Sequence, residues 1–537
     1  MPEDAPVDGK DLLRRIERLE EKLAATETEL KAAKIELARK DQIIAGLQKR
    51  LFGSSSERIN PNQLEFEFGE ALLGKPEPLP QPGSGEEKDK GAKGKRKRRR
   101  KPDLFPKNLP VVISDVIVPD EVKADPDGFV EIGEEYHDEL EAVPPQLYWD
   151  RKVRKKVRSK TDREQPPLLP PAPEPTLPGT LCGPNLMAQI LVDKYEDHLP
   201  HYRQSKRFLR KHEVELGRQT INGWTHAAAN HLAPIGEAIK SELSKAEVLQ
   251  IDESPGNYLD PGHGKTNQGY MWFYRDPEKR TVYCDWQLRR EHQAMFDILG
   301  IDAQSGTASF SGIIQCDGYS AYTALINRFS GIRLGGCLAH IRRKFYDALD
   351  QAPQVVKPIL WNIQLLYGIE RGLQQSNAPP ECRKLVRQAN SLPIFDSLRK
   401  EILTQRRNHL PQSKLGEAIT YAMGQFDEFA VYFEDGRVEI DNNRIENAIR
   451  PAKLGLKNYL FFGNADAGKA SALFYTLLGN CKAQGIDPER YLAEAIKCLP
   501  ANATLEQAVE LTPAALAPVL RSTPASRIDL NREAAAA

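Results

Sequence analysis

The sequence lacks the features that define disulfide-rich, membrane-spanning and secreted proteins. Its seven cysteines are spread over 537 residues, the first at Cys182, so they do not form a disulfide framework. It has no apolar run of about eighteen residues that could span a membrane, and its N-terminus lacks the apolar core of a signal peptide. We therefore expect a protein of a reducing cytoplasm with no membrane partner.

The sequence also lacks an excess of either charge, with 75 Lys and Arg against 75 Asp and Glu. This balance does not exclude a nucleic-acid partner, because charges of one sign can still gather locally. Residues 88–101 hold ten basic side chains against Asp89, and such a run is expected to become ordered on phosphates. A solvated spacer or a targeting signal is the alternative interpretation.

The N-terminal part carries a seven-residue repeat over residues 11–51. Apart from Thr26 and Lys40, the seam of this repeat is apolar, which predicts a coiled coil. The alternative is one amphipathic helix packed on the body of its own protein. The a positions are Ile16, Leu23, Leu30, Leu37, Ile44 and Leu51, and the d positions are Leu12, Leu19, Thr26, Ala33, Lys40 and Leu47.

A chain of this length has room for three or more domains, and composition breaks suggest where they lie. The expected parts after the repeat are a linker with the basic run (52–109), a small β-rich module (110–164) and a helical domain (180–240). A catalytic α/β domain (246–500) and a C-terminal tail (501–537) follow. Within the module, residues 147–157 suit a strand with a basic outward face.

The helical domain has the pattern of a helix-turn-helix. Helices are expected over 184–195, 202–211 and 219–230, with a turn near Gly217. The last of these would enter the major groove of DNA. An ordinary helical bundle gives the same pattern.

The α/β pattern begins near residue 246. Three β-rich segments are followed by a helix, a strand, a helix and a further strand, which is an α/β order. Only helices are expected over 353–435, followed by helices at 443–450 and 466–484. The β-rich segments are 248–252, 269–276, 281–287, 312–317 and 332–337, and the first helical stretch between them is 291–299.

Two aspartates, Asp252 and Asp317, close β-rich segments of this domain. Sites in α/β sheets assemble where strands end, and two neighbouring carboxylates stay ionised only with a cation between them. Mg²⁺ or Mn²⁺ prefers such oxygen ligands. Residues 438–463 offer three further acids, of which Glu446 lies on the first turn of the expected helix. Glu446 could equally form an ordinary ion pair with Arg450.

The order of these motifs resembles the transposases of the insertion-sequence 66 family, members of the DDE superfamily. The resemblance covers nearly the whole chain from residue 12 to about 500. The matching segments are LFGSSSERI (51–59), LVDKYEDHLPHYRQ (191–204), the 220–224 helix, IDES (251–254), CDGYSAY (316–322), CLAHIRRKF (337–345), DNNRIENAIRP (441–451), KNYLFFGNADAG (457–468) and GIDPERYL (485–492).

The resemblance implies a multidomain protein with an α/β ribonuclease-H-like catalytic core and an all-α insertion at about 353–435. It implies that Asp252, Asp317 and Glu446 are the catalytic acids and jointly hold two Mg²⁺ or Mn²⁺ ions. The implied reaction hydrolyses a phosphodiester at a transposon end and transfers the freed 3′-hydroxyl into target DNA.

The implied partners are double-stranded DNA, as terminal inverted repeats and as target, and further copies of the chain in a homo-oligomer, expected to be a dimer. The implied location is the cytoplasm, at the bacterial nucleoid. The need for accessory proteins encoded in the same element stays open. So do two other functions, a catalytically inactive DNA-binding regulator derived from a transposase and a ribonuclease-H-like structure-specific nuclease.

Several basic and polar residues are expected to contact DNA. They are Lys95, Arg96, Lys97, Arg98, Arg99, Arg100 and Lys101 of the basic run, Arg218, Gln219, Thr220 and Asn222 of the helix-turn-helix, and Arg342, Arg343, Lys344, Arg450 and Lys457 of the catalytic domain.

Zinc is not expected, although members of the family commonly carry a Cys-rich zinc module before the helix-turn-helix. The chain has no cysteine in that region. Cys337 and His340 have the spacing of half a zinc site but no second ligand pair, so we expect them to support the active site. The chain also departs from the family at Asn447, where an Arg is common.

Overall fold

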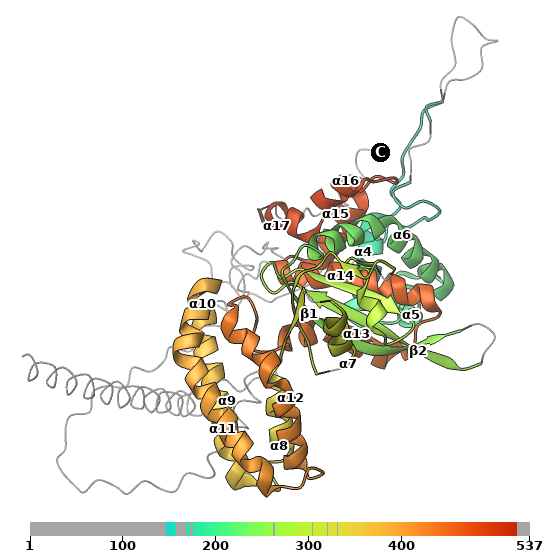
Figure 1. Ribbon diagram of the computed structural model, residues 1–537. Helices are drawn as coiled ribbons and strands as arrows, with labels where there is room; N and C mark the ends of the chain where they lie inside the picture. The colour runs from blue at the N-terminus through green and yellow to red at the C-terminus, as the bar shows by residue number, and fades with distance from the viewer. Residues whose placement is uncertain are drawn as a thin grey trace, which may run out of the picture. The chain divides into compact units, whose positions relative to one another are not determined.

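The computed structural model describes residues 146–156, 169–171, 175–260, 264–302, 304–318, 320–329 and 331–522 (Figure 1). The predicted coiled coil, the linker with its basic run and most of the β-rich module lie outside these residues. Residues 146–156 are described and exposed, and no strand forms there, so the prediction of a strand over 147–157 is wrong for this stretch. Alternating side chains make a strand only where a neighbouring strand pairs with it.

A five-stranded mixed sheet lies at the centre of the fold. Its strand order is β3-β2-β1-β6-β7, in which β1, β2 and β3 are antiparallel neighbours while β6 and β7 run parallel to β1. This confirms the mixed α/β core. The strands are β1 (Val248–Leu259), β2 (Thr266–Arg275), β3 (Val282–Gln287), β6 (Gly312–Gln315) and β7 (Ile332–Gly335).

Strand β1 is longer than the prediction, which ended it at Asp252. It pairs with β2 as far as Leu259, whereas its pairing with β6 stops at Gln250. Between Gln250 and Asn257 one edge of β1 has no strand beside it, which is where Pro255, lacking an N–H, is tolerated; farther along, Phe462 bridges this edge at Tyr258. Asp252 therefore lies at the start of an open sheet edge rather than at a strand end.

The segment between β3 and β6 is also different from the prediction of a helix over 291–299. It contains only one short 3₁₀ turn, η3 (His292–Met295), and a small hairpin of β4 (Ile301–Asp302) and β5 (Thr307–Ala308). The buried residues of this segment, including Met295 and Ile298, pack on the sheet. Their helix-like spacing reflects this burial and not a full helix.

Fourteen helices are formed by the described residues. They are α4 (Pro184–Tyr195), α5 (His201–His212), α6 (Arg218–Leu243), α7 (Ser320–Arg328), α8 (Leu338–Asp347), α9 (Pro353–Gln375), α10 (Pro380–Val386), α11 (Leu392–Gln405), α12 (Lys414–Glu434), α13 (Asn443–Tyr459), α14 (Ala465–Gln484), α15 (Pro488–Cys498), α16 (Leu505–Glu510) and α17 (Pro513–Ser522), with short η4 (Arg387–Ser391) and η5 (Arg406–Asn408) in the insertion. None of them is long and apolar enough to cross a membrane.

Two helices continue through a proline where the prediction stopped short of it. Helix α6 contains Pro234 and helix α13 contains Pro451. In α6 the apolar face continues beyond the proline through Ile235 and Ile239, both of which are buried. The burial of that face offsets the lost backbone hydrogen bond.

Helices from the two ends of the described chain share one core on the face of β2 and β3. Helices α4 and α6 pack against α14 and α15, and the green and red ribbons lie side by side in Figure 1. Residues 184–243 therefore have no separate core within the described part of the chain. The expected C-terminal tail begins with α16 and α17, whose Ala508, Ala517 and Leu520 are buried in this same core.

The expected all-helical insertion is present and is anchored by one buried arginine. Arg387 is fully buried and pairs with Glu370. Its Nη1 also donates to the carbonyl oxygens of Tyr432 (3.1 Å), Asp435 (3.2 Å) and Val438 (2.9 Å). The chain that leaves α12 toward α13 is thereby fixed to the insertion.

We predict that Gly468→Ala destabilises the protein by about 1–3 kcal/mol, because an added Cβ would lie 2.5 Å from the ring of Trp286. The matched control is Gly372→Ala in α9, where an added Cβ meets nothing within 4 Å. This change should stabilise the protein by about 0.5–1 kcal/mol through helix propensity. Urea unfolding measures both, and stabilisation by Gly468→Ala would contradict the packing.

Candidate functional site

Of the two aspartates predicted to share a site, Asp252 lies on β1 and Asp317 lies two residues after the end of the neighbouring parallel strand β6. Gln250 of β1 is in register with Gln315 of β6. Asp252 and Asp317 each follow two residues after these paired glutamines. Adjacent strands are about 4.8 Å apart, so this register brings the two aspartates to the same edge of the sheet.

The pKa of Asp252 is shifted mainly by burial and secondly by nearby carboxylates. Burial raises the pKa of Asp252 to about 7, and the charges of Glu253, Asp317 and Glu446 add to the effect. The backbone N–H of Glu253 donates to Asp252 Oδ1 at 2.8 Å, which partly offsets it. Such a carboxyl exchanges its proton close to neutral pH.

The third predicted acid comes from the first turn of α13. Ile445 and Ile449 of this helix are buried in the core beside β1 and β2, which turns Glu446 toward the aspartates. The Glu446 side chain is 42% exposed, and its Oε1 lies 3.7 Å from Nε2 of His340 on α8. The structure therefore brings all three predicted acids into one region.

A fourth acid, Asp441, lies just before α13. Its carboxylate accepts a hydrogen bond from Tyr367 Oη at 2.8 Å and from the Asn443 backbone N–H at 3.0 Å. Burial raises the pKa of Asp441 to about 6, and the charges of Glu439 and Glu446 raise it as well. The two hydrogen bonds act in the opposite direction and lower it. Asp441 is held by the insertion and the α13 N-terminus, in a structural position.

A buried polar network lies beneath the aspartates. Gln250 Nε2 donates to Gln315 Oε1 (3.0 Å) and to Glu439 Oε2 (3.1 Å), and both glutamines are fully buried. Gln315 Nε2 donates to the Glu439 carbonyl at 2.5 Å. Glu439 also pairs with Arg275 (3.4 Å) and Arg444 (2.9 Å). The network ties β1, β2 and β6 to the segment that leads into α13.

On the opposite face of β1, Glu253 is buried and engaged. It accepts a hydrogen bond from Tyr322 Oη at 3.0 Å and pairs with Arg290. Successive residues of a strand point to opposite faces, so Glu253 is not part of the cluster around Asp252. Glu253 therefore links the opposite face of β1 to Tyr322 of α7 and to Arg290.

Cys337 and His340, which were expected to support the active site, lie close to the segment that carries Glu446. Cys337 is buried, and its Sγ accepts the backbone N–H of Asn442 at 3.2 Å. Among the described residues, Nδ1 of His340 and Oδ1 of Asn442 are buried without a hydrogen-bond partner. Unsatisfied buried groups of this kind are expected where water or a ligand completes a site.

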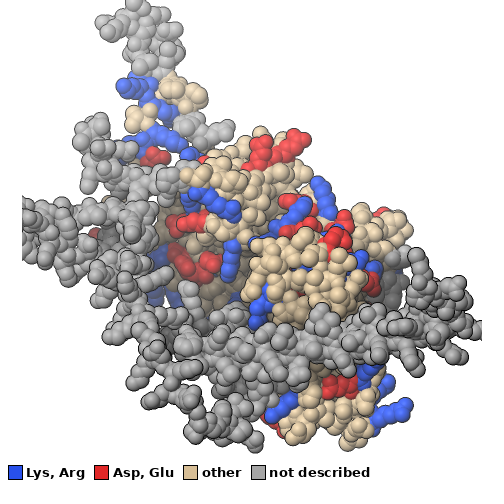
Figure 2. All heavy atoms as spheres, turned by 90° about the vertical axis from the view of Figure 1, so that its left-hand side faces the viewer, with Lys and Arg blue, Asp and Glu red and all other residues tan. Residues whose placement is uncertain are grey.

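The residues expected to contact DNA within the described chain lie at accessible positions. Arg218, Gln219, Thr220 and Asn222 are exposed on the first turns of α6, Arg343 and Lys344 on α8, and Arg450 and Lys457 on α13, while Arg342 is half-buried. The predicted set 95–101 lies outside the described residues. On the face drawn in Figure 2, described basic and acidic side chains are interspersed.

A divalent cation fits the donor chemistry of this site. In the parts of the chain that the structure covers, no three His, Cys, Asp or Glu side chains converge as a ready-made metal site. Two adjacent carboxylates, with a third in range of their charge, are nevertheless the hard oxygen donors that Mg²⁺ takes. Burial is the main cause of the raised pKa of Asp252, and the smaller contributions of Asp317 and Glu446 are the repulsion that a cation would relieve.

Sequence reasoning missed the residues that hold the acids in place. The glutamines that link the two strands, Glu439 with its arginines, and Tyr367 were not identified. One signal was available, because both strands contain the same Gln-x-Asp sequence, at 250–252 and 315–317. A polar side chain two residues before each Asp falls on the same face of its strand.

Comparison with known families gives two matches. The family described as Transposase IS66 family matches residues 179–470, which include all three predicted acids. The description Transposase C of IS166 homeodomain matches residues 39–113, which lie outside the described residues.

The chain is also similar to uncharacterized proteins of Sinorhizobium fredii. One is 32% identical over 529 residues, which cover 92% of this chain and 94% of the relative. A second is 29% identical over 397 residues, covering 71% of this chain and 75% of the relative. A third is 29% identical over 392 residues, with 68% of each covered.

We predict that Asp252→Asn stabilises the fold in a pH-dependent way. The folded state holds the Asp252 proton up to about pH 7, whereas the unfolded chain releases it near pH 3.8, so the carboxyl costs stability as pH rises. The gain from Asp252→Asn should grow from about pH 4 to pH 7, reach about 1–3 kcal/mol and then stay constant.

Thermal unfolding across this pH range measures the gain. The control is Asp427→Asn on α12, whose side chain is 98% exposed and should give no such rise. Equal pH profiles for the two variants would show that Asp252 is not in the crowded, buried setting described above.

Proposed function

We propose that this chain, which belongs to the IS66 family of transposases, cuts DNA at transposon ends and joins the freed 3′-hydroxyl to target DNA at a site formed by Asp252, Asp317 and Glu446. The observation that carries the proposal is that Asp252 and Asp317 each lie two residues after Gln250 and Gln315, which pair in register on neighbouring parallel strands. The raised pKa of Asp252 and its coupling to the other two acids support it.

The three acids would hold Mg²⁺ or Mn²⁺, as two ions per site. When bound, the metal ions lower the pKa of the attacking hydroxyl and stabilise the leaving oxygen. The fit of the donors to such ions supports this assignment.

The residues of the chain itself contribute position and proton binding. Asp252 holds a proton on its carboxyl near neutral pH until a cation or substrate takes its place. His340, 3.7 Å from Glu446, orients the third carboxylate. The buried Gln250–Gln315–Glu439 network keeps the strands and the α13 segment at fixed separation, which is what in-line chemistry requires.

DNA would be positioned by basic side chains around these acids. Arg343 and Lys344 on α8, with Arg450 and Lys457 on α13, are exposed for phosphate contacts. The first turns of α6 present Arg218 and Gln219 to solvent, as base readout in the major groove requires. We propose a homo-oligomer, a dimer in the simplest case, which pairs two transposon ends.

We predict that Asp317→Asn lowers DNA cleavage by about a hundredfold or more, because it removes one of the three metal-binding carboxylates. The assay uses a labelled duplex of the inverted repeat that flanks the gene, with Mn²⁺. Asp427→Asn on α12, whose side chain is 98% exposed, is the matched control and should cleave as the wild type does. DNA affinity of Asp317→Asn should not fall, since the change removes a negative charge.

The products decide between the candidate functions. Cleavage with strand transfer supports the proposal. Cleavage without any joined product would favour a structure-specific nuclease, and tight binding with intact DNA after long incubation would favour a regulator. Wild-type activity in Asp317→Asn would show that the acids are wrongly assigned.

We further predict that Gln219→Ala on α6 relaxes recognition of one base pair of the inverted repeat, at a cost of about 1–3 kcal/mol for the preferred sequence. Affinity for unrelated duplex should stay unchanged. Binding titrations with single-base variants of the repeat measure this. A uniform loss across all sequences would mean that α6 contacts only the backbone.

A further inference from the structure

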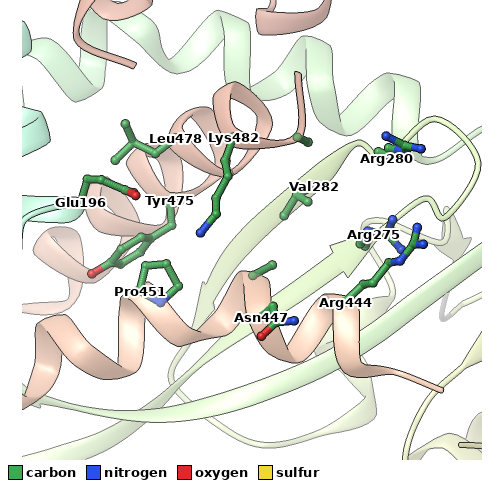
Figure 3. A pocket seen from close by; sticks show the side chains of 13 residues that line it. Glu196, Arg275, Arg280, Val282, Arg444, Asn447, Pro451, Tyr475, Leu478 and Lys482 are labelled. Carbon is green, nitrogen blue, oxygen red and sulfur yellow. The ribbon is translucent and has the colours of Figure 1, made fainter. Parts of the chain in front are cut away.

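A basic cavity of about 340 Å³ lies beside α13 (Figure 3). On α13 it is lined by Arg444, Asn447 and Pro451, which at about 3.6 residues per turn fall on the helix face away from Glu446. It is open to solvent and is bounded by α13, α14, the end of β2, the start of β3 and Glu196 after α4. Its lining includes four cationic side chains, Arg275, Arg280, Arg444 and Lys482, and one acid, Glu196. Most of the remaining lining is apolar. In Figure 3 Lys482 projects from α14 toward α13, and the arginines lie together at one side.

The positive charge of this cavity is only partly neutralised. Arg275 and Arg444 share the single carboxylate of Glu439. Within the described part of the chain, neither Arg280 nor Lys482 has a carboxylate at ion-pair distance. The four basic side chains outnumber the two acids, Glu439 and Glu196, so the cavity carries a net positive charge. In a concave and partly apolar pocket this charge attracts an anion more strongly than it would at an open surface.

The electrostatics of Arg275 agree with this imbalance. Burial lowers its pKa, Glu439 acts in the opposite sense, and the charges of Arg444 and Arg280 lower it further. Mutual repulsion among these guanidinium groups would be relieved by an anion placed between them.

Arg280 reaches the cavity from a strained backbone position. Its φ of 60° is in the left-handed region, which favours glycine. The turn around it is fixed by Asp276, whose Oδ1 accepts the N–H groups of Glu278 (2.8 Å) and Lys279 (3.1 Å). Strain of this kind is found where a side chain is held for a ligand.

The cavity is connected to the acids through one helix. Arg444, which lines the cavity, is two residues before Glu446, and its ion pair with Glu439 joins it to the network beneath Asp252. A nucleic-acid strand carries one negative charge per about 3.4 Å of helix rise. A DNA strand with one phosphate at the three acids therefore has neighbouring phosphates that can reach the opposite side of α13.

We propose that this cavity binds a backbone phosphate of the DNA strand flanking the reacting phosphodiester, with the attached sugar against the apolar lining. The proposal rests on the proposed function, because it takes DNA as the substrate. Arginine suits the task, since its planar fork donates two parallel hydrogen bonds to phosphate oxygens. A free phosphate or nucleotide shares this chemistry, and the experiment separates these sources.

The test compares two double variants of the full chain. Arg280→Gly with Lys482→Gln removes two cavity charges, and glycine accepts the left-handed backbone, so folding is retained. Lys400→Gln with Lys414→Gln removes two exposed charges from the insertion and is the matched control. Fluorescence anisotropy of a labelled inverted-repeat duplex is measured from 50 to 300 mM salt.

The cavity variant should bind about tenfold more weakly at 0.1 M salt, with a log–log salt slope reduced by about 1, because one phosphate contact is lost. The control should bind within about twofold of the wild type. Equal losses in both variants, or an unchanged slope in the cavity variant, would overturn the proposal. Circular dichroism confirms that both variants are folded.

A second arm uses inorganic phosphate and dAMP in thermal-shift assays. Stabilisation of the wild type by either compound, with no change of DNA affinity in the cavity variant, would assign the cavity to a small phosphate compound and overturn the proposal. Wild-type cleavage is scored separately. If the wild type cleaves DNA but the cavity variant keeps the wild-type salt slope, only the cavity proposal is refuted. If the cavity variant has a reduced slope but the wild type does not cleave, the cavity proposal is supported and only the proposed chemistry is refuted.

Discussion

The buried carboxylate of Glu439 is the point on which the site depends. It joins Gln250 of β1, Arg275 of β2 and Arg444 of α13, while its carbonyl accepts from Gln315 of β6. A buried charge is tolerated only when it is paired and hydrogen-bonded, and removing one partner leaves the others uncompensated. The network thus specifies one arrangement of strands and helix, and with it the separation of the three acids.

Much of the site could be predicted from the sequence, because its parts are local. An apolar β-rich segment ending in Asp indicated Asp252 and Asp317, and the helix expected at 443–450 indicated Glu446 on its first turn. Membership of the family is confirmed by the match over residues 179–470. The strands, the all-helical insertion and α4 were predicted because their apolar periodicity is strong.

The remaining features depend on contacts that local patterns do not encode. The strand over 147–156 does not form, and 291–299 contains only a short turn, because pairing and burial override local preference. Helices α6 and α13 pass through prolines since their buried faces continue. The partners of Glu439 lie up to 189 residues away along the chain, so no spacing rule could have identified them.

The position of the insertion has a consequence for the growing polypeptide. The acid on α13 follows a chain segment that Arg387 fixes to the insertion, so the position of the third carboxylate depends on a folded insertion. At about 5–20 residues per second, the ribosome reaches Glu439 some ~10–40 s after Gln250. During that interval the nascent protein has two of its acids and none of the link between them and α13. A truncated product ending before the insertion is complete would therefore contain Asp252 and Asp317 but neither Glu439 nor Glu446.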